Sequence, residues 1–210
     1  MIQGDLSSAL RFFDDATQYI ETSGLSRELN WQRASSFENF TETQFLRESA
    51  WVILCSGFRE SVVRRIFNHI SLSFCDWESA QLIVESKSLC RSAALASFRN
   101  ERKLDALLRT AEIIHWNGFC SFKEDILQDP IPRLQSLPYI GSITALHLAK
   151  NLGLNVAKPD RHLVRLSQQF GYACTANLCS DIARVTGEHV KVIDLVLWRY
   201  IADVRPTLQT

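Results

Sequence analysis

The sequence predicts an all-α fold, and three observations support this class. Apolar residues recur every three or four positions along most of the chain, which is the spacing that gives an amphipathic helix one buried face. No stretch alternates apolar and polar residues in the way that indicates a β-strand. Short polar stretches and isolated Gly or Pro residues separate the periodic segments, so we expect helices joined by short connections.

Composition sets broad limits on the kind of protein. The 210 residues suffice for one sizeable domain or two small lobes, and 46% hydrophobic with 22% charged residues is typical of a globular protein. No apolar run approaches the roughly 20 residues of a membrane span. Residues 1–15 lack the basic start and the apolar centre of a signal peptide. We therefore expect a cytoplasmic protein that does not enter the membrane.

Cysteine spacing and net charge argue against two kinds of protein, a zinc protein and a nonspecific nucleic-acid coat protein. The six cysteines form no CxxC pair and no histidine pair stands near them, so we expect reduced thiols and no zinc site. The 23 basic residues balance the 23 acidic ones, which argues against a protein that coats nucleic acid nonspecifically. A local basic surplus still occurs between residues 137 and 172. It consists of Lys150, Lys158, Arg161 and Arg165 against Asp160.

Capping residues and apolar periodicity delimit the helices expected in the first half of the chain. Asp5 is expected to cap a first helix, and the polar residues 22–40 are expected to form a loop. Thr41 to Gln44 is a capping-box sequence, which predicts a helix through Cys55. Asp76 is expected to cap a short helix. The other helices expected here cover residues 62–70, 89–98 and 100–116.

Turn residues divide the second half in the same way. Gly118 is expected to end the preceding helix. Ser121 and Glu124 are expected to begin a short helix, which Asp129 and Pro130 interrupt. The remaining helices are expected over residues 131–136, 142–151, 161–170, 175–186 and 188–203.

A Pro- and Gly-bearing turn lies between two of these helices, at residues 137–141. Pro138 disfavours helix at Leu137, and Gly141 permits a positive φ or a close approach of the backbone to another molecule. The helix that starts at Ser142 presents free N–H groups at its first turn, and such groups bind anions, phosphate above all. An ordinary corner in a helical core is the alternative interpretation.

Asp160 stands immediately before another predicted helix. Aspartate is favoured at such an N-cap, where its side chain accepts hydrogen bonds from backbone N–H groups. The helix dipole also keeps a carboxylate ionised at this place. An ionised carboxylate is suited to meet a positive charge that develops during a reaction.

The hairpin turn and Asp160, taken together, resemble the helix-hairpin-helix (HhH-GPD) superfamily of DNA glycosylases. The residues that match the hairpin consensus are Leu137, Pro138, Gly141, Thr144 and Ala145. Asp160 falls where that family has its catalytic aspartate. The resemblance implies an all-α fold of two lobes with the active-site cleft between them. The implied single unit covers residues 1–210, with lobe A at about 40–155, its hairpin at 130–152, and lobe B at about 1–39 plus 156–210.

Three departures from the family bear on the reaction. Tyr139 stands where the family usually has glycine, which makes the turn less open. Ile143 stands where bifunctional members carry a lysine, and isoleucine cannot form a Schiff base. The cysteines that hold an iron–sulfur cluster in some members are absent. The resemblance therefore implies a monofunctional glycosylase of base excision repair that hydrolyses the N-glycosidic bond, without lysine-driven strand cleavage.

The resemblance also implies a DNA grip at the hairpin. Backbone N–H groups there would bind a phosphate, and Lys158 would bind phosphate or, as an alternative, serve as a displaced lyase amine. No cofactor is required, although Na⁺ or K⁺ can be held by the backbone carbonyls of Gln135, Leu137 and Ile140. The residues implied in DNA binding are Tyr139, Gly141, Ser142, Ile143, Thr144, Lys158, Arg161 and His162.

The wedge and the base pocket are assigned from aromatic and charged residues. Phe58 and Arg59 are the wedge candidates, with a core role for Phe58 as the alternative. Aromatic rings stack bases well, so Trp51 and Trp116 are candidates for the pocket wall, and a place in the core is their alternative. Glu48 can read a base edge if it faces the cleft. A solvated helix face is the alternative for Glu48.

The expected partner is double-stranded DNA with a damaged or modified base, bound by a nucleoid-associated monomer. Alkylated purines, oxidised guanine and a hypermodified phage base all remain candidates for the excised base. Two other functions compete with this one. The first is a non-catalytic helix-hairpin-helix module of a repair or phage-defence complex, in which Asp160 is only a cap. The second is a helical protein-interaction domain that binds no nucleic acid.

Overall fold

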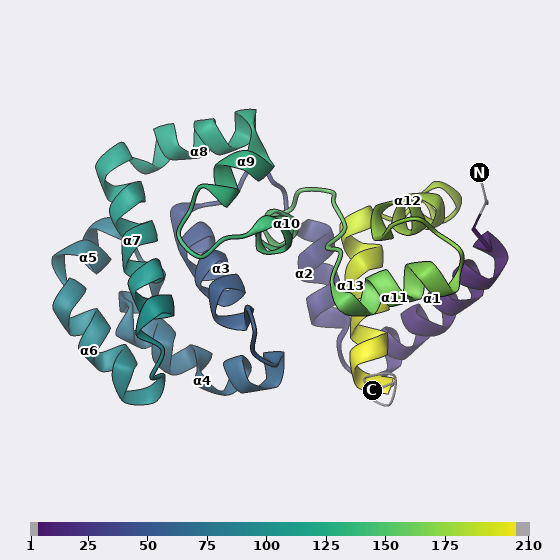
Figure 1. The fold of residues 1–210 in the computed structure, drawn as a ribbon, viewed down its shortest axis with the longest axis horizontal. Helices are drawn as coiled ribbons and strands as arrows, with labels where there is room; N and C mark the ends of the chain where they lie inside the picture. Colours follow the sequence, from purple (N-terminus) through teal and green to yellow (C-terminus); the bar gives the residue numbers. More distant parts are fainter. Residues whose placement is uncertain (1–3, 205–210) are drawn as a thin grey trace. The chain divides into compact units, whose positions relative to one another are not determined.

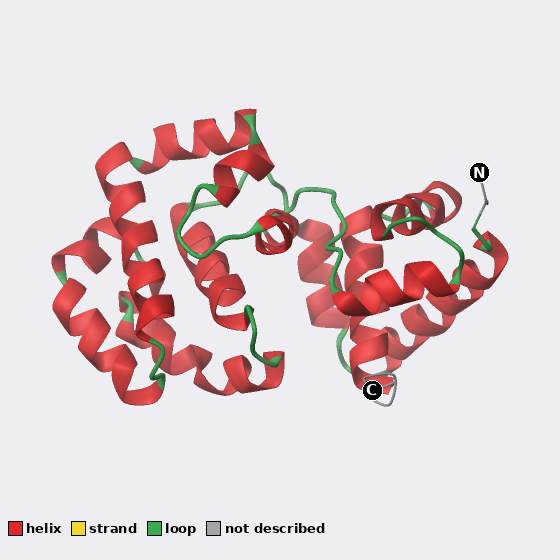
Figure 2. Cartoon of the chain, viewed as in Figure 1, coloured by secondary structure: helices red, strands yellow, loops and turns green. Residues whose placement is uncertain are grey.

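The computed structural model describes residues 4–204, and within them it contains thirteen α-helices, one 3₁₀ turn and no β-strand (Figures 1 and 2). The predicted all-α class is therefore confirmed. No helix among the described residues is both long and apolar enough to cross a membrane. The helices are α1 (Leu6–Thr22), α2 (Ser26–Ala34), α3 (Glu42–Cys55), α4 (Glu60–Ser73), η1 (Cys75–Trp77), α5 (Ala80–Glu85), α6 (Lys87–Ser97), α7 (Glu101–Asn117), α8 (Phe119–Gln128), α9 (Pro130–Gln135), α10 (Ser142–Asn151), α11 (Arg161–Gln169), α12 (Thr175–Thr186) and α13 (Val190–Val204).

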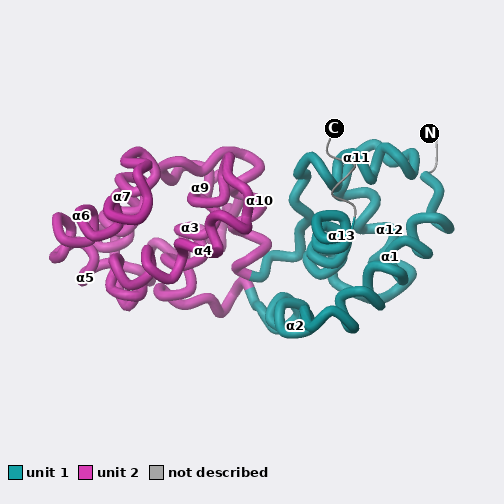
Figure 3. The backbone as a smooth tube through the Cα atoms, turned by 90° about the horizontal axis from the view of Figure 1, so that it is seen from below, with its two compact units in different colours: residues 1–36, 153–210 teal, residues 37–152 magenta. Residues whose placement is uncertain are grey.

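The chain divides into two compact units (Figure 3). Unit 1 combines residues 1–36 with residues 153–210, so the two ends of the sequence belong to the same unit. Unit 2 is continuous and covers residues 37–152. The hairpin of α9 and α10 lies in unit 2, whereas α11 with its capping Asp160 lies in unit 1.

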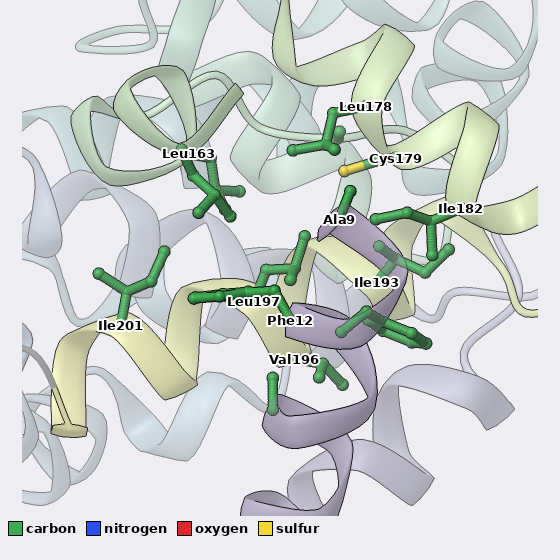
Figure 4. Packing of buried hydrophobic residues seen from close by; sticks show 14 of the residues in the cluster. Ala9, Phe12, Leu163, Leu178, Cys179, Ile182, Ile193, Val196, Leu197 and Ile201 are labelled. Carbon is green, nitrogen blue, oxygen red and sulfur yellow. The ribbon is translucent and has the colours of Figure 1, made fainter. Parts of the chain in front are cut away.

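Unit 1 is built around the long apolar helix α13, which packs against α1, α2, α11 and α12. Ten of its core residues are labelled in Figure 4, and they come from α1, α11, α12 and α13. Edge-to-face contacts of Phe12 with Phe170 and Tyr200 extend the apolar core. Burial of this many aliphatic and aromatic side chains is the main stabilising contribution within the unit.

Helix α2 corrects the sequence prediction, because residues 22–40 were expected to be a loop. The segment has few apolar residues to indicate a helix, and in α2 only Leu29 and Gln32 are buried. Two of its contacts are with residues distant in the sequence. The Arg199 side chain donates two hydrogen bonds to Glu28 at 2.7 and 2.8 Å, and Arg33 pairs with Glu188 at 2.6 Å.

In unit 2, α3 packs against α4, α7 and α10. The predicted capping box is confirmed, since the Thr41 and Gln44 side chains each accept a hydrogen bond from the other's backbone N–H.

Two further predicted helix ends are confirmed. Asp5 caps α1 in unit 1, and Gly118 ends α7 in unit 2 with φ of 75°.

Two expected helix starts in unit 2 are wrong. Ser79, rather than Asp76, caps the short helix α5, and Asp76 lies one turn earlier with φ of 48°. An aspartate tolerates that left-handed conformation better than most residues. Helix α8 begins at Phe119 directly after Gly118, so Ser121 lies inside the helix and does not begin it.

Candidate functional site

The hairpin turn of unit 2 joins α9 to α10. Ile140 N donates a hydrogen bond to Leu137 O at 3.2 Å, with Pro138 and Tyr139 between them. Tyr139 has φ of 66°, which is the left-handed region where a non-glycine residue costs about 1–2 kcal/mol. Tyr139 therefore adopts the left-handed backbone conformation that glycine adopts without strain. Tyrosine adopts it at an energetic cost.

Gly141 does not adopt the positive φ that the sequence allowed. Its φ is −89° and its ψ is −178°, an extended conformation open to any residue. A Cβ added there would meet no described atom within 4 Å beyond its own chain neighbours. Neither backbone conformation nor internal packing within the described residues thus requires glycine at this position.

The start of α10 is suited to an anion. No side chain caps this helix, and Ser142 and Ile143 are both exposed. The first-turn N–H groups of a helix have no partner within the helix. The turn therefore offers backbone donors and the positive end of a helix dipole to an acceptor such as phosphate.

Asp160 caps α11, as expected. Its Oδ1 accepts hydrogen bonds from His162 N and Leu163 N, each at 3.0 Å. Its Oδ2 lies 3.8 Å from Lys158 Nζ, and 13% of the side chain is exposed. The carboxyl group is therefore held rigidly by one oxygen while the side chain still reaches the surface of unit 1.

A second carboxylate, Asp194 on α13, supports the segment that carries Asp160. Asp194 Oδ2 accepts a hydrogen bond from Lys158 N at 2.6 Å, and Lys158 O accepts one from Asp160 N at 2.8 Å. Asp194 is buried. Our sequence reasoning missed this residue. The signal was present, because a carboxylate in the middle of an apolar helix must find partners when it is buried.

His162 is the third polar side chain beside Asp160. Burial lowers the pKa of His162 below its ordinary value, although the Asp160 carboxylate opposes that change. Burial therefore favours the neutral imidazole over the charged form. Arg161 is exposed at the same helix start and donates from Nε to His162 Nε2 at 3.4 Å. Lys150, which was counted in the basic surplus, is buried and does not contribute to that surface.

The wedge candidates lie in the turn between α3 and α4. Phe58 is 41% exposed, and its ring makes an edge contact with the Phe98 ring at 5.6 Å between centroids. Arg59 is exposed at the N-cap of α4. Phe58 is therefore anchored on one side and open on the other, which differs from a residue of the core.

The tryptophan candidates for the pocket lie on different helices. Trp116, near the end of α7, is 76% exposed and makes an edge contact with His115. Trp51 on α3 is half-buried against Phe67, with 5.0 Å between ring centroids. Trp116 thus contacts His115 and Trp51 contacts Phe67, and the two tryptophan rings are not in contact with each other in these ring pairs.

Glu48 is half-buried and does not form the solvated helix face that was the alternative. Asn151 Nδ2, at the end of α10, donates a hydrogen bond to Glu48 Oε2 at 2.9 Å. Burial raises the pKa of the Glu48 carboxyl to about 7, and the hydrogen bond from Asn151 opposes part of that rise. Our sequence reasoning did not find Asn151, because it lies 103 residues from Glu48.

Replacing Glu48 with glutamine is expected to flatten the pH dependence of stability. An unfolded carboxyl loses its proton near pH 4.5, whereas Glu48 in the fold keeps its proton up to about pH 7. The wild-type free energy of unfolding should therefore fall by roughly 3 kcal/mol as pH rises through this window. Urea denaturation at pH 5 and pH 8 measures this loss. The same loss in the Glu48→Gln variant would contradict the assignment.

The comparisons with known proteins concern the fold. No protein-family model and no curated protein sequence matches the chain. The crystal structure of the 8-oxoguanine DNA glycosylase of Thermotoga maritima aligns with a TM-score of 0.64 and 17% identity, over 93% of this chain and 97% of that one. The Methanocaldococcus jannaschii 8-oxoguanine glycosylase/lyase, crystallised with a 15mer DNA containing 8-oxoguanine, aligns with a TM-score of 0.53 and 18% identity. That alignment covers 91% of this chain and 95% of that one. The chain therefore has the fold of these two 8-oxoguanine DNA glycosylase structures.

Proposed function

We propose that this protein is a monofunctional DNA glycosylase, which hydrolyses the N-glycosidic bond of a damaged or modified base taken out of double-stranded DNA. The observation that carries this proposal is Asp160. It is a carboxylate fixed by two backbone N–H groups at a helix start and still partly exposed. It occurs in a chain with the fold of two 8-oxoguanine glycosylases. An enzyme that acts on a base inside a duplex must first extrude that base.

The hairpin turn would bind the DNA backbone. Residues 141–143 are exposed, no described side chain caps the helix start, and Gly141 leaves room for a phosphate to approach. Contacts of this kind position a protein on DNA without reading its sequence. Arg161 and Lys158 would add positive charge from unit 1.

We also propose that a monovalent cation binds at the same turn. The carbonyl oxygens of Gln135, Leu137 and Ile140 would hold it. Leu137 O already accepts one hydrogen bond from Ile140 N, and a carbonyl oxygen has a second lone pair to offer. Na⁺ or K⁺ bound there would add positive charge beside a phosphate.

The chemical step would depend on the charge of Asp160. Departure of the base builds positive charge on the sugar, and an ionised carboxylate facing C1′ stabilises that charge. The same carboxylate can orient or deprotonate the attacking water. Its two backbone hydrogen bonds keep it in place, so no reorganisation is needed when the charge develops.

Hydrolysis is preferred to strand cleavage because Ile143 occupies the position at which the bifunctional members of the family carry lysine. Lys158 Nζ lies 3.8 Å from Asp160 Oδ2. We assign its ammonium to phosphate binding.

The test is a panel of duplexes, each with one modified base, incubated with the protein. Free bases are identified by mass spectrometry and strand breaks by denaturing gel. The duplex with 8-oxoguanine comes first because of the two similar structures. We expect base release that leaves an intact abasic strand and no covalent complex after borohydride reduction. A trapped complex that disappears in Lys158→Ala would instead identify Lys158 as a lyase amine.

A non-catalytic DNA-binding module is the second candidate function, because a cap role alone accounts for the two backbone hydrogen bonds of Asp160. This candidate predicts duplex binding without base release on any member of the panel. The absence of both binding and release would leave a helical protein-interaction domain.

A further inference from the structure

One buried lysine in unit 2 connects two turns that are distant in sequence. Lys103 on α7 is 1% exposed, and its Nζ donates to Leu54 O at 2.9 Å, to Ser56 O at 2.5 Å and to Ile53 O. These carbonyls belong to the end of α3 and to the turn after it, where a helix leaves acceptors unpaired. An ammonium has three N–H donors. All three can be used in the fold.

The same ammonium also lies against two exposed aromatic rings. Its Nζ is 4.9 Å from the centroid of the Phe58 ring and 5.3 Å from the centroid of the Tyr139 ring. Both distances are within the range of a cation–π interaction. Phe58 belongs to the turn after α3 and Tyr139 to the hairpin turn, so one charged group contacts the two turns at once.

A buried lysine is a costly way to end a helix. Removing an ammonium from water is unfavourable even when it is hydrogen-bonded, and an apolar residue with an ordinary cap would satisfy α3 with less desolvation. Tyr139 is also in a strained backbone conformation with φ of 66°. The cation–π contact with Lys103 is attractive and so opposes that strain.

We infer that Lys103 is a positioning residue, which fixes the Phe58 turn and the Tyr139 turn at one spacing so that both meet the same DNA duplex. The inference rests on the proposed function, in which Phe58 fills the gap left by the extruded base and the hairpin binds a nearby phosphate. Lys103 itself is covered by protein and does not contact DNA.

The chain offers a matched control in Lys191 on α13 of unit 1. Lys191 is also buried, and its Nζ donates to Ser35 O at 2.5 Å, to Ser35 Oγ at 3.2 Å and to Gly153 O at 3.3 Å. Replacing either lysine with methionine removes a buried ammonium and leaves backbone carbonyls unpaired. Only Lys103→Met would also release the two turns.

Hydrogen exchange of the free protein tests the connection without DNA. Phe58 N donates to Cys55 O at 3.2 Å and Ile140 N donates to Leu137 O at 3.2 Å, so each turn contains a hydrogen-bonded amide whose exchange reports on the turn. We expect both amides to exchange about tenfold faster in Lys103→Met and to be unchanged in Lys191→Met. Faster exchange at Phe58 alone, or at neither amide, would overturn the inference.

A duplex with a tetrahydrofuran abasic analogue opposite 2-aminopurine tests the consequence for DNA. Insertion of Phe58 into the gap should unstack the 2-aminopurine and raise its fluorescence. We expect Lys103→Met to bind this duplex within about threefold of wild type but to lose most of the fluorescence rise, as Phe58→Ala does. Lys191→Met should retain both duplex binding and the fluorescence rise. A full rise in Lys103→Met would overturn the inference while the proposed function stands. No binding by the wild-type protein would overturn both.

Discussion

Replacing Asp160 with asparagine is expected to slow base release by at least about a hundredfold and to leave duplex affinity within about threefold of wild type. The asparagine oxygen can still accept the hydrogen bonds of His162 N and Leu163 N, so the cap of α11 and the local fold persist. What is lost is the negative charge that would stabilise the positively charged sugar. The measurement is single-turnover release of the base that the wild-type protein excises, together with a duplex titration.

Asp5 provides the matched control for this experiment. It is also an N-cap aspartate, whose Oδ1 accepts a hydrogen bond from Ser8 N at 3.0 Å. Asp5→Asn removes the same charge from the start of a different helix, and we expect base release to be unchanged. If Asp160→Asn releases base as fast as Asp5→Asn, Asp160 is a cap and not the catalytic group.

Replacing Asp194 with alanine is expected to destabilise unit 1 by roughly 3 kcal/mol. The buried carboxylate accepts from Lys158 N at 2.6 Å, and alanine would leave that donor without its acceptor in the interior. The segment that places Asp160 would loosen as well, so we expect base release to slow by about tenfold in protein that is still folded. Urea denaturation and single-turnover release measure the two effects.

The Asp194→Asn variant removes the negative charge but keeps a side-chain oxygen that can accept a hydrogen bond. Its side-chain oxygen can still accept from Lys158 N, so Asp194→Asn should lose less stability than Asp194→Ala and should release base nearly as fast as wild type. Wild-type stability in Asp194→Ala would show that the hydrogen bond to Lys158 N does not support the segment.

Local signals were sufficient for most helix ends. Thr41 and Gln44, Asp5 and Gly118 were assigned correctly from the sequence because a cap is an interaction within one turn of the chain. Asp76 was assigned wrongly for the same reason. It resembles a cap, but Ser79 three residues later takes that role and Asp76 adopts a left-handed conformation.

Helix α2 and the partners of the candidate site could not be found in this way. Glu28 pairs with Arg199 over 171 residues, and Lys158 N bonds Asp194 over 36. Lys103 donates to Ser56 O over 47 residues. In each pair, the sequence around one residue does not indicate which residue is its partner. The pairing is determined by how the helices pack.

From its sequence alone, this protein could be assigned an all-helical class, most of its helix ends, a hairpin turn suited to phosphate and an aspartate at a helix start. These features depend on residues a few positions apart, whose spacing is visible in the chain. Only the tertiary structure decided that Glu48 is half-buried beside Asn151, that Asp194 holds the segment before Asp160 and that Lys103 contacts both Phe58 and Tyr139. The environment of a charged group depends on segments that folding brings together from distant parts of the sequence.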